Sequence, residues 1–593
     1  MPRKQTYAEI RDEKLAALRK NAARPERREQ NTREFTRLMA EYGADPVALR
    51  DLAATLSIAG LLEDALKFLQ DALQRLGPRP ELLCGLADLL LESGRTREAM
   101  KCLVDAASAF PTELEPRRSL GRILLKTGRS APAVEQYRAA LASKPGDPEC
   151  ELGLGLALQS WGRFHLAIPR LLAAIAARPK SLDAAAALGT CFHRTGDYTA
   201  ATGAFRKALA IERGLAVALA GEAAALAAGG RTGEAVERLK PLLRGDVAVP
   251  IATVLARIAG DAGFLDEAIR ICERVLANPN HAAAPRAALA WSLGELYEQS
   301  GDVDRAFEAY SLAQRQGGDR GLSADSYRRF VDAAGATFSA DALAALPRAS
   351  IPTDLPVFIV GAPQSGTRLV ECVLSSHPSI FAAGELRDVS DWMPELVARA
   401  GGKTEYPACL ASLNAETIDQ FSALQRRWYA ELGGDAIRVT DANPMNYQHL
   451  GLIRQFLPGA RVIHVERDPL DACFAWFTAP PGTSPSRTDL ALIAAIHGQY
   501  RRLMTHWKSV LDLPILEVRY EDLVANPEAQ TRRMIDFCGL PWDDACLRPH
   551  ESKRLALTPD LDRLRRPIDA SQAARAARFG AHLDPLRAAL AQA

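Results

Sequence analysis

The chain has 593 residues, 48% hydrophobic and 24% charged, so it is long enough for several domains and ordinary in composition for a globular protein. Lysine plus arginine (73) nearly balances aspartate plus glutamate (72), which excludes a global positive charge that would favour nucleic acid. Because the charges balance, any anion site must be local. The sequence contains no run of about 18 apolar residues, so it predicts no membrane span.

Residues 1–45 mix charges of both signs and contain no apolar core segment. This pattern predicts a charged lead-in helix or a disordered segment, and it does not predict a secretory signal. Ten cysteines are scattered without CxxC pairs, and HExxH spacing is absent. We therefore expect reduced thiols, no metal site and a cytoplasmic location.

A 34-residue period fills residues 46–320. An alanine follows five residues after each regularly spaced glycine, and these glycines are Gly60, Gly94, Gly128, Gly162, Gly196 and Gly230. Two looser units follow, around Gly263 and Gly301. A glycine ends one helix and turns the chain, and small residues let two helices approach closely. The period therefore predicts a pair of antiparallel helices in each unit.

This period resembles the tetratricopeptide repeat, in about eight units. The alternative is an unrelated helical bundle rich in alanine. The resemblance implies an α solenoid with a groove that binds a peptide or a partner protein. A scaffold role or self-association remains the plainer possibility.

The composition changes after a linker region at residues 321–354, which contains the proline-bearing stretch LPRASIPTDLP. Short β-branched runs then alternate with helical stretches; the runs are VFIV, AIRVTD, ARVIHV and PILEVRY. This alternation predicts that residues 355–593 form an α/β, P-loop-like domain with a mostly parallel sheet.

The stretch LPVFIVGAPQSGTRLVECVLSSHP, which begins at Leu355, predicts a strand, a tight turn from Gly361 to Gly366 and a helix from about Thr367. Backbone N–H groups at a helix start bind phosphate or sulfate, and glycines allow the anion a close approach. An ATP-binding loop requires lysine after its second glycine, whereas Thr367 and Arg368 follow here, which disfavours an ATPase. A purely structural strand–turn–helix is the alternative for the loop alone.

Further segments follow in a characteristic order. FAAGEL contains Glu385, ARVIHVERDPLDACFAWF contains Arg467, and TPDLDRLRRPI contains Arg565. Together with the loop, and with VTDANPMNYQHL and PILEVRYEDL, they resemble the sulfotransferase family. The resemblance is greatest to bacterial proteins in which tetratricopeptide repeats precede a domain similar to protein-tyrosine sulfotransferase.

The resemblance implies 3′-phosphoadenosine 5′-phosphosulfate (PAPS) as the donor of a sulfonate that moves to a hydroxyl. It implies that Glu385 is the catalytic base, that Arg467 binds the 3′-phosphate and that Arg565 is a further donor ligand. The implied donor-binding residues of the loop are Gly361, Gln364, Ser365, Gly366, Thr367 and Arg368. Taken singly, Glu385 also fits a solvated or capping role, and Arg467 also fits an ion pair with Asp468 or Asp471.

The chain departs from the family pattern at several implied site residues. Gln364 stands in place of an arginine, Ala442 in place of a lysine and Ala475 in place of a serine, while Asp560 adds a negative charge near the anion. Loss of one such electrostatic donor typically costs about 10²–10³ in rate. Arg368, in the first turn of the predicted helix, is a candidate replacement.

Two main functions remain open from the sequence, beside a weaker third, a transferase of altered donor or acceptor. One is a PAPS-dependent sulfotransferase whose repeats present a peptide or protein acceptor, such as a tyrosine. The other is a catalytically impaired protein that keeps the sulfotransferase fold and acts through its repeats as a binding or scaffold module.

Overall fold

A computed structural model describes residues 7–22, 24, 28–245, 247–316, 323–402, 404–480, 489–551, 567–568 and 572–592. The chain divides into two compact units within the repeats. Unit 1 comprises residues 1–161 and 169–179, and unit 2 comprises residues 162–168 and 180–593. Unit 2 therefore contains the later repeats together with the sheet.

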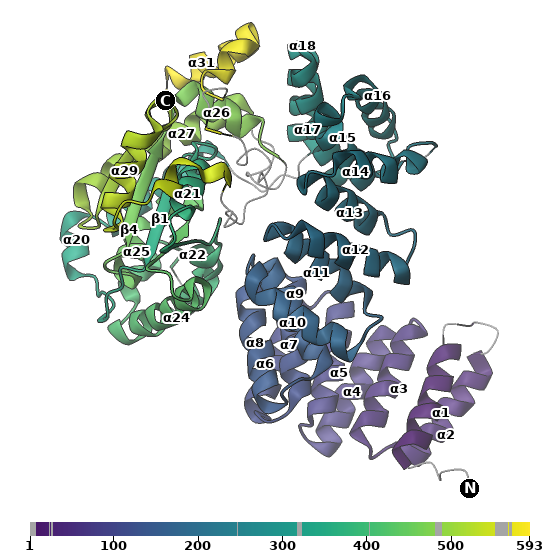
Figure 1. The fold of residues 1–593 in the computed structure, drawn as a ribbon. Coiled ribbons are helices and arrows are strands. Elements are labelled where there is room, and N and C mark those ends of the chain that lie inside the picture. Colours follow the sequence, from purple (N-terminus) through teal and green to yellow (C-terminus); the bar gives the residue numbers. More distant parts are fainter. Residues whose placement is uncertain are drawn as a thin grey trace. The chain divides into compact units, whose positions relative to one another are not determined.

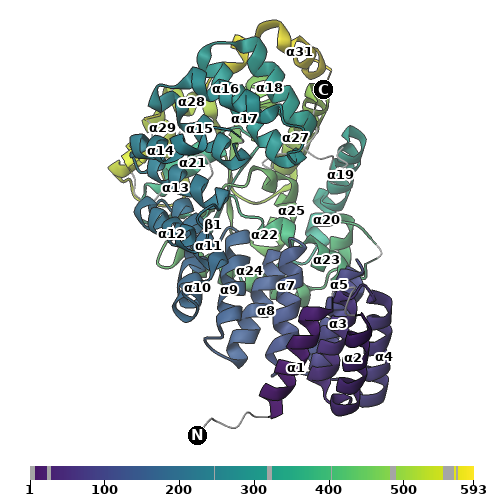
Figure 2. The same ribbon diagram turned by 90° about the vertical axis from the view of Figure 1, so that its right-hand side faces the viewer.

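Unit 1 is helical, and Figure 2 shows its paired helices as parallel rods. Its helices are α1 (Tyr7–Asn21), α2 (Arg28–Tyr42), α3 (Pro46–Ile58), α4 (Leu62–Leu76), α5 (Pro80–Glu92), α6 (Thr96–Ala109), α7 (Leu114–Lys126), α8 (Ser130–Ser143) and α9 (Pro148–Ser160). Helix α10 (Phe164–Ala177) includes residues of both units.

The repeats continue in unit 2 as further helix pairs. These are α11 (Leu182–Arg194), α12 (Tyr198–Ile211), α13 (Ala216–Ala228), α14 (Thr232–Leu239), η2 (Lys240–Leu242), α15 (Val249–Ala262), α16 (Leu265–Leu276), α17 (Ala283–Ser300) and α18 (Val303–Gln316). The predicted helical solenoid is confirmed. Two helices, α19 (Ala324–Thr337) and α20 (Ala340–Ala345), lie where the sequence indicated a linker region.

The periodic glycines lie at the turns between the two helices of each unit. All eight, including Gly263 and Gly301, have φ between 73° and 83°. A residue with a Cβ atom is strained in this region, so glycine fixes where each first helix ends. Small residues inside the helices have a different reason: a Cβ atom on Gly153 would lie 2.4 Å from the ring of Tyr137.

Five parallel strands form the sheet of unit 2, in the order β2-β3-β1-β4-β5. The strands are β1 (Pro356–Gly361), β2 (Ile380–Ala382), β3 (Arg438–Asp441), β4 (Arg461–Glu466) and β5 (Ile515–Arg519). Every residue of β1 is buried, as its unbroken apolar run predicts for a central strand. The chain runs outward from β1 to β2, returns to β3 beside β1, and continues on the other side with β4.

Helices lie around this sheet in Figure 1, where β1 and β4 are labelled among α21, α25, α27 and α29. The helical elements of this part are α21 (Thr367–Ser375), α22 (Asp388–Asp391), α23 (Met393–Arg399), η3 (Ala408–Ser412), α24 (Ala415–Gly433), η4 (Pro444–His449), α25 (Leu450–Phe456), α26 (Pro469–Phe477), α27 (Leu490–Val510), α28 (Tyr520–Ala525), α29 (Pro527–Phe537), η5 (Asp544–Leu547), η6 (Pro549–Glu551), η7 (Arg575–Leu583) and α31 (Asp584–Leu590). The predicted α/β architecture is confirmed, and the sheet is parallel throughout the described residues.

Candidate functional site

The loop from Gly361 to Gly366 joins the end of β1 to the start of α21, as the sequence predicted. Because all five strands are parallel, it shares one edge of the sheet with the segments that follow β2, β3 and β4. Ligands of such sheets bind where neighbouring strands lead the chain in opposite directions. Strand β1 lies at that position, since its neighbours β3 and β4 continue on opposite sides.

The backbone of the loop leaves little room for side chains. A Cβ atom on Gly361 would lie 2.4 Å from Ser365 Oγ and 2.5 Å from the carbonyl oxygen of Val465. Gly366 has φ of 106°, and Gln364 is one of the few residues other than glycine with positive φ, at 65°. The loop is thus held in a conformation that brings its backbone close to the start of α21.

The loop contains an unsatisfied donor. Ser365 is fully buried, and its Oγ has no hydrogen-bond partner among the described residues. The N-cap of α21 is Gly366, which supplies no side-chain hydrogen bond to the first turn. A buried hydroxyl without a partner costs about 1–3 kcal/mol. An anion at the start of α21 would accept from this hydroxyl, so the loop fits a phosphate or sulfonate group.

Arg467 follows β4 and lies against the loop. Its Nη1 donates to the carbonyl oxygen of Gln364 at 3.0 Å, and its Nη2 donates to that of Gln572 at 2.5 Å. Its guanidinium lies 4.7 Å from the ring of Tyr520, and its Nε is buried without a hydrogen-bond partner among the described residues. Its hydrogen-bond partners are thus backbone carbonyls, whereas the alternative from the sequence was Asp468 or Asp471.

Glu385 lies in a turn after β2 and is held by the helix that follows the loop. Arg368 Nε donates to Glu385 Oε1 at 2.7 Å. The Arg368 side chain is 13% exposed and that of Glu385 is 33% exposed, so the carboxylate is reachable from solvent while the guanidinium is largely covered. The structure therefore brings together Glu385, Arg368 and the loop.

The backbone around Glu385 is fixed on both sides. The N–H of Gly384 donates to Glu371 Oε1 at 2.9 Å, and the carbonyl of Gly384 accepts from the N–H of Ala442 at 2.9 Å. On the other side, the N–H of Leu386 donates to Asp441 Oδ1 at 3.2 Å. These bonds come from α21 and from the end of β3, so the turn cannot shift as a whole without breaking them.

Glu371 and Asp441 are buried carboxyl groups that sequence reasoning did not select. Glu371 Oε1 also accepts from Thr440 Oγ1 at 2.7 Å, while its Oε2 has no partner among the described residues. Burial raises the pKa of Glu371 to about 7. Burial also raises the pKa of Asp441 well above its usual range. The available signal was an acidic residue inside the apolar helix LVECVL, one turn after Arg368.

The positions that depart from the family pattern differ in their surroundings. Ala442 is fully buried in an apolar cluster with Val370 and Ile463. Ala475 lies in α26, after Arg467. Asp560 and Arg565, and with them the expected donor contact of the TPDLDRLRRPI segment, lie outside the described residues.

A second polar cluster lies on β4 and β5. His464 Nδ1 lies 3.6 Å from Glu517 Oε1 and 3.8 Å from Glu466 Oε1, and these three side chains offer atoms within 4.8 Å of one another. Lys508 Nζ donates to Glu517 Oε1 at 2.5 Å. Burial lowers the pKa of His464 to about 4, so this histidine is neutral at pH 7. Because Lys508 already supplies the positive charge, we assign no metal to this cluster.

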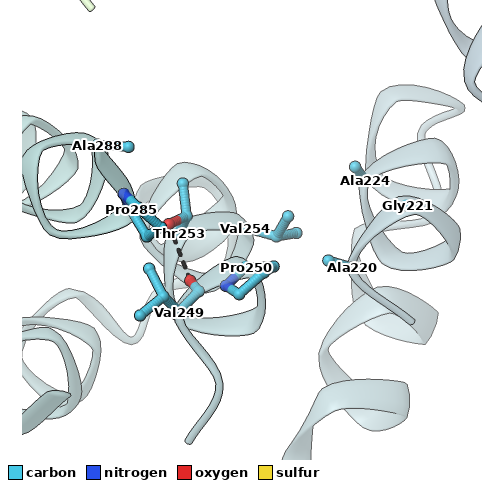
Figure 3. A pocket seen from close by; sticks show the side chains of 9 residues that line it. All are labelled: Ala220, Gly221, Ala224, Val249, Pro250, Thr253, Val254, Pro285 and Ala288. Carbon is cyan, nitrogen blue, oxygen red and sulfur yellow. Dashed lines mark hydrogen bonds between the residues drawn. The ribbon is translucent and has the colours of Figure 1, made fainter. Parts of the chain in front are cut away.

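The later repeats contain an apolar hollow of about 320 Å³, shown in Figure 3. Its walls come from α13, α15 and α17, and its lining residues are Ala220, Gly221, Ala224, Val249, Pro250, Thr253, Val254, Pro285 and Ala288. The Thr253 hydroxyl donates to the carbonyl oxygen of Val249 at 2.9 Å, so the polar group of this side chain already has a partner. Among the helices in the described ranges, none combines the length and apolar character needed to cross a bilayer.

Comparisons with known proteins match the two parts separately. Residues 356–544 match the model of the sulfotransferase family. Residues 84–148, 152–216 and 253–321 match the tetratricopeptide repeat. A solved tetratricopeptide repeat protein from Parabacteroides merdae aligns at 14% identity over 45% of this chain and 98% of its own, with a TM-score of 0.33. YrrB, titled a TPR protein with an unusual peptide-binding site, aligns at 23% identity over 31% of this chain and 95% of its own, with a TM-score of 0.26.

The chain covers less than two thirds of the length of each of the three curated relatives that follow. An uncharacterised protein of Aquifex aeolicus is 27% identical over 59% of this chain and 47% of its own. Protein-tyrosine sulfotransferase A of Caenorhabditis elegans is 25% identical over 33% of this chain and 52% of its own. Protein-tyrosine sulfotransferase 1 of Danio rerio is 25% identical over 36% of this chain and 62% of its own. The chain thus spans about half the length of the relatives it matches.

Proposed function

We propose that the part of the chain that matches the sulfotransferase family moves a sulfonate from PAPS to a hydroxyl group. The tetratricopeptide repeats precede it in the same chain. The observation that carries the proposal is the loop after β1, whose buried Ser365 hydroxyl lacks a partner and whose following helix holds Glu385 through Arg368. The anion-binding element and the proton acceptor therefore occupy one edge of the sheet.

The residues around the loop have distinct roles in this reaction. The loop backbone and the Ser365 hydroxyl bind the 5′-phosphosulfate, and Arg467 and Arg565 bind the 3′-phosphate. Glu385 accepts the proton of the acceptor hydroxyl. The hydroxyl oxygen then forms a bond to sulfur while the bond between sulfur and the bridging phosphate oxygen breaks, which releases adenosine 3′,5′-bisphosphate.

The acceptor we propose is a tyrosyl hydroxyl in a peptide or protein. The relatives named protein-tyrosine sulfotransferases support a tyrosine acceptor, and the repeats support a polypeptide partner. We assign the reaction to the cytoplasm, as the sequence suggested.

A second function is favoured by one specific observation. Ala442, where the family pattern has a lysine, is buried in an apolar cluster and supplies no positive charge itself. A protein that binds the donor nucleotide without transferring sulfonate, and that acts through its repeats as a scaffold, fits this feature.

Calorimetric titration with adenosine 3′,5′-bisphosphate, followed by transfer of labelled sulfonate to a tyrosine-containing peptide, tests both functions. Micromolar nucleotide binding with transfer supports the enzyme, and binding without transfer supports the scaffold. Absence of binding at millimolar nucleotide rejects a donor site altogether.

The first prediction concerns the base. Glu385→Gln keeps the shape of the side chain but removes its capacity to accept a proton, so turnover falls about 10²–10⁴-fold. Glu395→Gln is the control, because Glu395 is an exposed residue that pairs with Arg399 and the change removes the same charge. Turnover of the Glu385→Gln enzyme within a factor of three of the wild type would remove Glu385 from this role.

A further inference from the structure

Arg368 occupies a position that helix electrostatics disfavour. It is the second residue of α21, which contains no acidic residue in its first turn. The helix dipole places partial positive charge at this end, so an arginine there is electrostatically disfavoured. The contact with Glu385 offsets this cost in the structure, and a bound anion would offset it more completely.

Arg368 is also the sole source of full positive charge in the loop sequence. From residue 356 to residue 370 it is the one charged residue. Arg467, the other arginine at the loop, directs Nη1 and Nη2 to the backbone carbonyls of Gln364 and Gln572. Arg368 is therefore the charged partner that the loop sequence itself offers to a sulfonate at the start of α21.

The Arg368–Glu385 pair can separate without a shift of the backbone around Glu385. Glu385 follows Gly384, whose N–H and carbonyl are both bonded, and precedes Leu386, whose N–H is bonded to Asp441. Arg368 reaches Glu385 through a long side chain with several rotatable bonds. The pair therefore separates by rotation of the Arg368 side chain, while the backbone that carries the Glu385 carboxylate stays in place.

We infer that the Arg368–Glu385 ion pair is opened by the donor: the phosphosulfate group takes over the Arg368 guanidinium and leaves the Glu385 carboxylate available to the acceptor hydroxyl. This inference rests on the proposed function and adds to it a binding order, donor before proton removal. It also makes Glu385 a competitor of the donor for the same cation.

The test is calorimetric titration of four proteins with PAPS in the absence of acceptor: the wild type, Glu385→Gln, Arg368→Gln and the double variant. Glu385→Gln removes the competitor, so it binds PAPS about five- to tenfold more tightly than the wild type. Arg368→Gln binds more weakly than the wild type. The gain from Glu385→Gln disappears in the Arg368→Gln background, because the cation at stake is no longer present.

Controls separate this effect from a general change in charge and from misfolding. Glu395→Gln removes one negative charge elsewhere and leaves PAPS affinity unchanged. If Arg368→Gln does not fold, Arg368→Lys takes its place, because lysine keeps the positive charge but lacks the Nε contact with Glu385. In the Arg368→Lys background, Glu385→Gln increases PAPS affinity by less than it does in the wild type.

Each outcome bears on a separate statement. If the wild type and Glu385→Gln bind PAPS equally well, the inference that the donor opens the ion pair is wrong. It is also wrong if Glu385→Gln still increases PAPS affinity in the Arg368→Gln background. Neither result contradicts the proposed donor site. Failure of all four proteins to bind PAPS overturns the proposed function and the inference with it. A gain in Glu395→Gln as large as that in Glu385→Gln also overturns the inference.

Discussion

At the scale of single residues, the buried carboxyl of Glu371 makes the stability of the folded protein depend on pH. It is fully buried and accepts hydrogen bonds from Gly384 and Thr440 on one oxygen only. Burial raises its pKa from about 4.5 to about 7, so the folded protein holds this proton over a range where the unfolded chain has lost it. The folded state therefore loses stability as pH rises from about 4.5 to 7.

The second prediction follows from this sign. Below pH 4.5 both states are protonated and no penalty exists, whereas above pH 7 the penalty is complete, on the order of 3 kcal/mol. Glu371→Gln cannot titrate, so its melting temperature minus that of the wild type becomes more positive between pH 5 and pH 8. Melting curves that stay parallel across this range would contradict the prediction.

Some residue roles were accessible from the sequence and others were not. Glycine spacing and the loop motif placed Gly361, Gly366 and the start of α21 correctly, because local backbone geometry fixes them. The partners of Arg368 and Arg467 depend on segments that follow other strands, so local sequence carried no signal for them. The donor-binding roles themselves remain predictions.

At the scale of elements, the loop between β1 and α21 depends on a close approach of backbone to backbone. Gly361 lies against the carbonyl of Val465 on β4, which cannot move without disturbing the sheet. The strands, their parallel pairing and the helix after β1 followed from apolar runs and spacing. Their order in the sheet did not, because long-range pairing leaves no periodic signal in the chain.

The third prediction tests this packing. In Gly361→Ala the new Cβ atom would lie 2.5 Å from the Val465 carbonyl, so the loop must shift, and we expect nucleotide affinity to fall at least tenfold. Gly335→Ala in α19 is the control, since nothing lies within 4 Å of its Cβ position and alanine favours a helix by about 1 kcal/mol. Calorimetry checks the affinity, and unchanged binding in Gly361→Ala would show that the loop adapts.

At the scale of the whole molecule, an ion-pair network within unit 2 joins the last repeat to the carboxyl-terminal region. Arg575 Nε donates to Glu298 Oε1 at 2.8 Å, and its Nη1 donates to Thr478 Oγ1 at 2.8 Å. Trp291 Nε1 also donates to the carbonyl of Thr478 at 2.7 Å. Sequence analysis predicted two domains and a linker region, but it offered no signal for these contacts between distant segments.

The fourth prediction concerns this network. Glu298→Gln leaves the largely buried Arg575 without its counter-charge, and we expect a loss of about 3 kcal/mol in the stability of unit 2. Glu98→Gln, which breaks an exposed pair with Arg95 in unit 1, is the control, and we expect a much smaller loss because solvent screens that pair. Urea melts of both variants measure the difference, and equal losses would show that the network contributes no more than a surface pair.

The separation of β1 from its neighbours along the chain has a consequence for synthesis on the ribosome. Each repeat helix meets its partner within one period, whereas Val357 of β1 pairs with Thr440 and with Arg461. At about 5–20 residues per second, this strand waits about 4–20 s for those partners to be made. During this interval an entirely apolar strand is unpaired, so we expect nascent chains to aggregate at this stage. The repeats are synthesised before β1, so we expect them to be complete before the interval begins.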